Sequence, residues 1–144
     1  MADLLPGVWG QVNFNPPARD PASIWNDTDN TLNPNLAGWW SIDFAVLIPS
    51  LVAHQNIEIT WLAAIRNGDP PASAPEVWVE DHFMKPQAGF DNARVGTDLF
   101  TWWDGTEKLS FWLMQQNSRD DTITVDETAT ASTFRYAYMG RAGS

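Results

Sequence analysis

The chain has 144 residues, and its 18 acidic against 8 basic side chains give a formal net charge of −10 at pH 7. Proteins neutralise the phosphates of nucleic acids and the headgroups of anionic membranes with Lys and Arg, so we expect neither as a partner. The chain has no cysteine, which excludes disulfide frameworks, thiolate catalysis and thiolate metal sites.

The remaining composition predicts one folded domain. A chain of this length forms a single core in most cases, and 44% hydrophobic residues with nine tryptophans can fill one. No apolar stretch approaches the ~20 residues that a membrane-spanning helix needs. The first ten residues lack the features of a signal peptide, so we expect none.

Residues 1–22 are predicted to form an extended N-terminal arm, and residues 23–144 the folded domain. Proline and glycine interrupt the arm, which limits it to edge strands or extended paths. Its apolar residues favour contacts, either along its own domain or with a neighbouring subunit or host surface. The predicted arm contacts are Leu4, Leu5, Val8, Trp9 and Phe14.

The clearest strand pattern follows a turn cluster at residues 26–35. Between Trp39 and Ile48, the large apolar residues Ile42, Phe44, Val46 and Ile48 alternate with Ser41, Asp43, Ala45 and Leu47. This period of two predicts a half-buried strand. Residues 57–61 repeat the pattern, and that run ends in a loop that begins at Asn67-Gly68. A shorter strand is predicted at residues 77–79.

The second half of the chain adds further predicted strands. We expect residues 84–98 to be irregular and residues 99–103 to form a strand before the Asp104-Gly105 turn. Residues 109–114 are apolar on both faces, which predicts a strand that is covered on both sides. Strands are also expected at residues 123–125 and 134–139. Seven or eight short strands without an amphipathic helix predict an all-β sandwich or barrel.

The candidate catalytic and metal-binding groups are sparse. Neither His54 nor His82 has a convincing partner at ligand spacing. Residues 27–30 begin like an oxygen-ligand calcium loop but lack its glycine and distal glutamate, so a solvated turn is expected. A hydrolase would need the Asp27/Asp29 or Glu80/Asp81 pair in one cleft. We therefore expect no enzyme activity, no metal and no cofactor.

The two tryptophan pairs, Trp39-Trp40 and Trp102-Trp103, carry the functional prediction. Adjacent side chains of a strand point to opposite faces, so one member of each pair lies away from the core. Such a ring can meet a subunit, a sugar, or a loop of its own chain. A subunit interface is favoured because tryptophan is enriched there.

Several segments, taken in order, resemble tumour-necrosis-factor-like and complement-globular-head-like jelly rolls. These are residues 37–44, residues 59–66 with the Asn-Gly that follows, residues 107–113, residues 122–125, and the Ser-Thr-Phe strand within residues 131–139. The resemblance implies a jelly-roll β-sandwich whose last strand lies near the axis of a homotrimer. Small jelly rolls without a collagen stalk are similar to virion proteins of tailed bacteriophages.

We therefore expect a capsid decoration protein on the virion surface. It would form a homotrimer and bind the major capsid protein or another virion protein. The alternative is a receptor-binding or carbohydrate-binding fibre tip that uses exposed tryptophans. The predicted interface residues are Trp39, Trp40, Trp102, Trp103, Trp112, Phe134, Tyr136 and Tyr138.

Overall fold

The computed structural model describes residues 3–14, 20–67, 76–89, 91–128 and 132–141. Eleven β-strands and one short 3-10 helix form the regular structure of these residues. The longer strands are β5 (Gly38–Ile48), β6 (Ile59–Asn67), β7 (Glu76–Met84), β8 (Ala93–Trp103), β9 (Leu109–Asn117) and β11 (Thr133–Gly140). The two-residue strands are β1 (Asp3–Leu4), β2 (Gly10–Gln11), β3 (Trp25–Asn26), β4 (Thr31–Leu32) and β10 (Ile123–Thr124), and the 3-10 helix η1 spans Leu51–His54.

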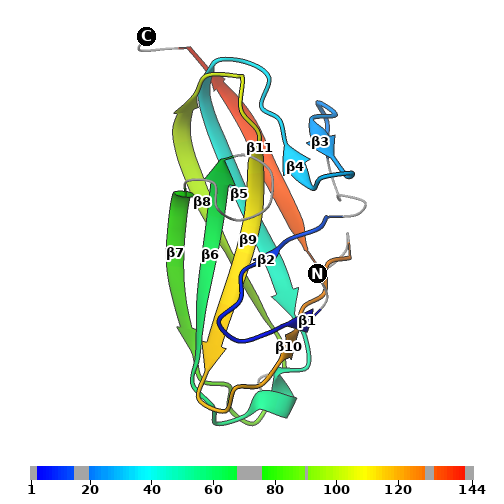
Figure 1. The fold of residues 1–144 in the computed structure, drawn as a ribbon, viewed down its shortest axis with the longest axis vertical. Helices are drawn as coiled ribbons and strands as arrows, with labels where there is room; N and C mark the ends of the chain where they lie inside the picture. Colours follow the sequence, from blue (N-terminus) through cyan, green and yellow to red (C-terminus); the bar gives the residue numbers. More distant parts are fainter. Residues whose placement is uncertain (1–2, 15–19, 68–75, 90, 129–131, 142–144) are drawn as a thin grey trace.

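The strands form two antiparallel sheets that face each other (Figure 1). The smaller sheet has the order β11-β5-β8, and the larger has the order β3-β4-β9-β6-β7, with β2 also paired to β9. β1 and β10 form a separate pair beside one end of the sandwich. The predicted all-β sandwich is therefore confirmed.

Strand β5 shows how the sequence pattern creates the core. Its side chains alternate strictly between buried and partly exposed along all 11 residues. Ile42, Phe44 and Val46 point into the sandwich, where their apolar surface is removed from water. The predicted strand at residues 39–48 is confirmed, and only its first residue lies one position earlier.

Strand β9 lies at the centre of the larger sheet and is covered on both faces, as predicted. Phe111 and Leu113 join the core, while Trp112 on the opposite face is also buried. The guanidinium of Arg66 covers that face, with its carbon 5.6 Å from the ring centre of Trp112 and 4.4 Å from that of Trp9. A cation held between two aromatic faces gains electrostatic attraction, and its planar group packs well against them.

Two sequence predictions about strand limits were wrong. β7 continues to Met84 instead of ending near residue 79, and β8 begins at Ala93 within the segment expected to be irregular. β8 pairs with β5 along its entire length, from Ala93 opposite Ile48 to Trp103 opposite Gly38. Tertiary pairing therefore sets this strand, although its own sequence alternates poorly. Most of the loop predicted after Asn67 lies outside the described residues.

The described parts of the N-terminal arm lie against the domain. β1 pairs with β10 and β2 pairs with β9, and Leu4, Val12 and Phe14 are buried in the core. Within the described residues, no helix has the length and apolar character needed to cross a bilayer.

Candidate functional site

The outward face of the smaller sheet carries an exposed cluster of large apolar side chains. We call it the aromatic face and define it as Trp39, Phe100, Trp102 and Met139. Phe100, Trp102 and Met139 are 60%, 38% and 56% exposed, respectively. Contiguous exposed apolar surface of this kind marks sites of interaction in soluble proteins.

The strand register brings the rings of the aromatic face together. Trp39 lies directly opposite Trp102 in the β5–β8 pair, and Phe100 lies one row further along the same face. The rings of Trp39 and Phe100 are nearly parallel, 5.3 Å apart at 8°, whereas Trp39 and Trp102 meet edge to face at 5.8 Å and 81°. These contacts fix the rings into a preformed platform.

Polar groups adjoin the platform on the same face. Arg135 donates a hydrogen bond to Asp43 over 3.1 Å, and Ser41 lies between Phe100 and Ala137 in the cross-strand register. These residues and Tyr136 line a shallow hollow of about 390 Å³. The aromatic face is therefore bordered by an ion pair and a hydroxyl group, and the guanidinium of Arg141 lies 5.9 Å from the ring centre of Trp102.

The structure corrects part of the predicted interface. Trp40, Trp103, Trp112 and Phe134 are buried inside their own subunit, so their side chains have almost no surface left for a partner. Trp40 and Trp103 occupy positions of β5 and β8 whose side chains point into the sandwich. Their indole N–H groups donate to the carbonyls of Leu36 and Glu107, respectively. The prediction that each tryptophan pair divides between the two faces is confirmed, with Trp39 and Trp102 outward.

The two predicted tyrosines lie at the edge of the sheet, where they make hydrogen bonds within the chain. The hydroxyl of Tyr136 donates to Asp20 at 2.6 Å and accepts from the Ala22 amide at 2.8 Å. Burial, together with the Asp20 hydrogen bond, raises the pKa of Tyr136 to about 12. Tyr138 donates to the carbonyl of Ala37 and stays partly exposed.

The sequence prediction missed Phe100 and Met139. Phe100 has the same parity as Trp102 along β8, so the alternation of that strand could have identified it. Met139 follows Arg135 and Ala137 with a period of two, so the alternation of β11 could have identified it as well, although the register with β5 shifts beyond Tyr138.

The predicted arm contacts separate into two groups. Leu4 and Phe14 are buried in the domain's own core, and Trp9 packs against Arg66. Leu5 and Val8 are exposed at a turn in which the amide of Val8 donates to the carbonyl of Leu5. Only these last two side chains retain a large free surface.

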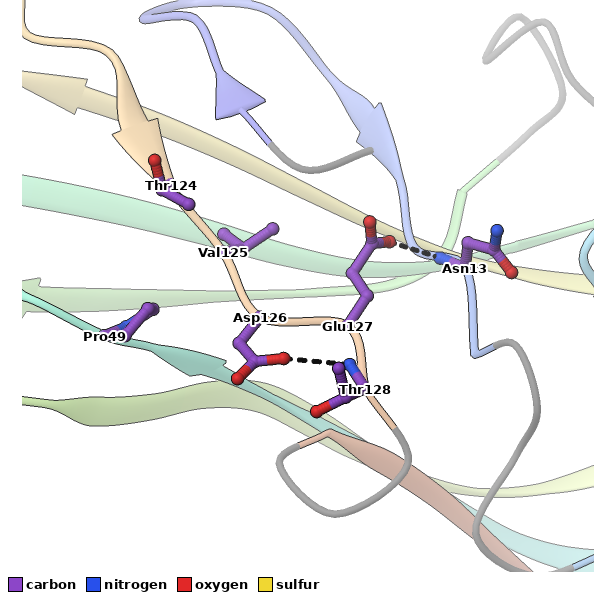
Figure 2. Close-up of a pocket in the computed structure, with 7 residues that line it drawn as sticks. All are labelled: Asn13, Pro49, Thr124, Val125, Asp126, Glu127 and Thr128. Carbon is purple, nitrogen blue, oxygen red and sulfur yellow. Dashed lines mark hydrogen bonds between the residues drawn. The ribbon is translucent and has the colours of Figure 1, made fainter.

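A groove of about 480 Å³ follows the end of the arm (Figure 2). Asn13 lies on one side and the extended segment 124–128 on the other, with Pro49 at one end. The amide of Asn13 donates to Glu127 Oε2 at 2.6 Å, which links the two sides. Asp126 accepts a hydrogen bond from the amide of Thr128, which lowers the pKa of its carboxyl.

The remaining candidate groups are engaged in separate contacts. His82 Nε2 lies 2.7 Å from the carbonyl of Gly96, and Glu80 accepts from the Thr97 hydroxyl. Asp81 follows Glu80 in β7 and is exposed. Among the described residues, no three His, Asp or Glu side chains lie close enough to hold a metal ion.

The predicted calcium-like turn is occupied by an ion pair. Asp29 accepts from Lys108 at 2.8 Å and from the Thr31 hydroxyl at 2.6 Å. Burial works against ionisation of this carboxyl, but the bonds from Lys108 and Thr31 outweigh it and lower its pKa.

Asp121 forms two ion pairs whose contribution to stability can be tested by changing the pH. Arg119 contacts it at 2.6 Å and His54 at 2.9 Å, and these bonds lower its pKa from 3.8 to about 2. A carboxyl whose pKa is lower in the folded state stabilises the fold fully above pH 4, and this contribution is lost as the pH falls toward 2. In thermal unfolding between pH 7 and pH 2, we expect Asp121→Asn to lower the midpoint at neutral pH. The difference from the unmodified protein should shrink between pH 4 and pH 2, and a difference that stays constant over this range would contradict the role of the Asp121 carboxylate.

Comparison with known proteins supports the fold. No protein-family model matches the chain, and no curated protein matches it by sequence. Among solved structures, Eiger TNF from S. frugiperda aligns with a TM-score of 0.53 over 99% of this chain and 94% of that chain, at 10% sequence identity.

At that identity the likeness establishes the fold alone. The chain therefore has an all-β sandwich fold similar to the TNF-like jelly roll, as the sequence resemblance implied. The likeness to virion proteins of bacteriophages stays a prediction.

Proposed function

We propose that the chain is a structural protein of a bacteriophage virion, which assembles into a homotrimer and decorates the capsid. The observation that carries this proposal is the aromatic face, because three large rings lie together on one sheet, with Phe100 and Trp102 exposed and Trp39 partly exposed in the single chain. In the superfamily that the sequence resembles, the last strand lies near the trimer axis, and the last strand of this chain, β11, belongs to the sheet that carries the aromatic face. This resemblance favours the aromatic face as the subunit contact.

The energetics also favour burial of this face. Apolar surface contributes roughly 25 cal/mol per Å² when it leaves water, so a fully buried aromatic side chain gains about 1.5–3 kcal/mol. Three copies related by a three-fold axis bury the same patch three times, and the closed ring prevents open-ended fibres. The remaining acidic surface keeps such a trimer soluble and disfavours nucleic acid and membrane.

The trimer can be tested by measuring the mass of the purified protein in solution. We expect a mass of three chains for the unmodified protein and a folded single chain for Phe100→Ser combined with Trp102→Ser. Phe83→Ser is the matched control, because Phe83 is 66% exposed on the other sheet. It should leave the trimer intact. A single-chain mass for the unmodified protein would contradict the proposal.

The role in the virion needs a second measurement. Capsids assembled without the protein should bind the trimer and then withstand heating that disrupts bare capsids. If the trimer does not bind such capsids, the proposed homotrimer would stand but the proposed role as a decoration protein would be contradicted.

A fibre-tip or carbohydrate-binding module is the second candidate function. The nearly parallel rings of Trp39 and Phe100 beside the Asp43–Arg135 pair favour it, since sugar rings stack on flat aromatic surfaces and present hydroxyls to polar side chains. Quenching of tryptophan fluorescence by an oligosaccharide, with a single-chain mass in solution, would favour this candidate over the capsid decoration protein.

A further inference from the structure

The described arm, residues 3–14, is anchored in the domain by three buried side chains. Leu4 is 2% exposed, and Val12 and Phe14 are 0% exposed. Phe14 lies at the centre of the aromatic core, with its ring 5.2 Å from Phe134, 5.6 Å from Trp25 and 5.7 Å from Phe111. The domain therefore contains a slot that an apolar strand must fill.

Backbone and side-chain hydrogen bonds hold the arm in that slot. The amides of Gly7 and Val12 donate to the carbonyls of Gln115 and Phe111, both at 2.8 Å. The buried side chain of Gln115 donates in turn to the carbonyl of Leu4 at 3.0 Å. At the far end, Asn13 meets Glu127 across the groove of Figure 2. Both edges of the slot therefore recognise an extended backbone.

We propose that this slot accepts residues 3–14 of a second copy of the chain, so that arms exchange between subunits. The contacts named above connect the arm to residues far along the chain, from Trp25 to Glu127. The same contacts form whether the arm comes from its own chain or from a neighbour. The free energy difference between the two arrangements therefore depends only on the linker and on the local concentration of arms.

Two features shift this balance toward exchange. Residues 15–19, which join the arm to the domain, have the sequence Asn-Pro-Pro-Ala-Arg, and proline favours an extended path over a tight reversal. Subunits held together also present arms to each other at high effective concentration. This second point rests on the proposed trimer, whereas the slot and its contacts do not.

Disulfide trapping in the full-length chain tests the exchange. The chain has no cysteine, and Asp3 and Thr124 are exposed residues directly opposite each other in the β1–β10 pair. Directly opposite antiparallel residues have Cα atoms about 4.5–5.5 Å apart, within the range of a disulfide. Asp3→Cys and Thr124→Cys are placed on two differently tagged chains, which are co-expressed, purified and oxidised.

The register supplies a matched control. Thr122 is also exposed, but Leu5 is its expected counterpart when the register of β1 and β10 is continued, so Asp3 and Thr122 are too far apart for a disulfide. If arms exchange, the Asp3→Cys and Thr124→Cys chains should form at least tenfold more cross-linked pairs than the Asp3→Cys and Thr122→Cys chains.

Two other results would contradict the exchange or the slot. Equal yields for the two mixtures, with a disulfide inside one chain for the Asp3→Cys and Thr124→Cys double variant, would overturn the exchange. Failure of the double variant to form any disulfide would overturn the slot itself. Because the mass measurement in solution reports the trimer independently, failure of the exchange can be distinguished from failure of the proposed function.

Discussion

Replacing Gly96 by alanine is expected to destabilise the protein by about 3 kcal/mol or more, at the upper end of the cost of overpacking. Gly96 lies in β8 opposite Ala45 of β5. A Cβ atom at this position would lie 1.8 Å from the carbonyl oxygen of Phe44 and 2.8 Å from the Cα of Ala45. Both obstacles are backbone atoms, so no side-chain rotation can relieve the overlap and the two strands must separate.

The cost of Gly96→Ala can be measured by urea unfolding at a fixed protein concentration, with tryptophan fluorescence as the signal. Gly89→Ala is the control, because a Cβ there meets nothing within 4 Å although its φ of +86° disfavours alanine. Strain of this kind costs roughly 1–2 kcal/mol. Similar losses for the two variants would mean that β5 and β8 do not approach as closely as described.

Gly96 also shows why the sequence predicted some strands and missed others. β5 was predicted to within one residue because every second side chain from Ile42 to Ile48 is large and apolar. β8 begins with Ala93, Arg94, Val95 and Gly96, which alternate poorly, and its pairing with β5 creates the strand. Four of the two-residue strands, β1, β2, β4 and β10, likewise pair with a strand distant in sequence, whereas β3 pairs with β4 in a local hairpin.

The sequence likewise predicted only part of the aromatic face. Parity within a strand predicts that one ring of each tryptophan pair faces outward, and Trp39 and Trp102 do so. The pattern of residues 109–114 predicts that Trp112 is covered but not by which residues, because the cover comes from Trp9 and Arg66 elsewhere in the chain. A one-dimensional pattern identifies the faces of a strand but not what packs on them.

The arm is the element about which the structure adds most to the sequence prediction. Its prolines and glycines predicted edge strands or extended paths, and the described residues 3–14 contain the two-residue strands β1 and β2. Its apolar residues permitted contacts with either its own domain or a neighbour, and the pattern could not distinguish these. Phe14 follows Val12 with the spacing of a strand face, and both side chains enter the core.

Replacing Phe14 by alanine should therefore have the second large effect, a loss of about 3–5 kcal/mol in the free energy of unfolding. The substitution removes a fully buried ring that contacts Trp25, Phe44, Phe111 and Phe134 in edge-to-face geometry. Domains of this size have a total stability of about 5–15 kcal/mol, so the variant should be unfolded or close to it at 37 °C.

Leu5→Ala is the matched control for Phe14→Ala, since Leu5 belongs to the same arm but is 56% exposed. It should change stability by no more than about 0.5 kcal/mol. Urea unfolding of the two variants at one protein concentration compares the anchor with its exposed neighbour. If Phe14→Ala were as mild as Leu5→Ala, the arm would be a loosely attached tail whose slot tolerates vacancy, and an exchanged arm could not connect subunits. A large difference between them means that whichever arm fills the slot completes the core of that subunit.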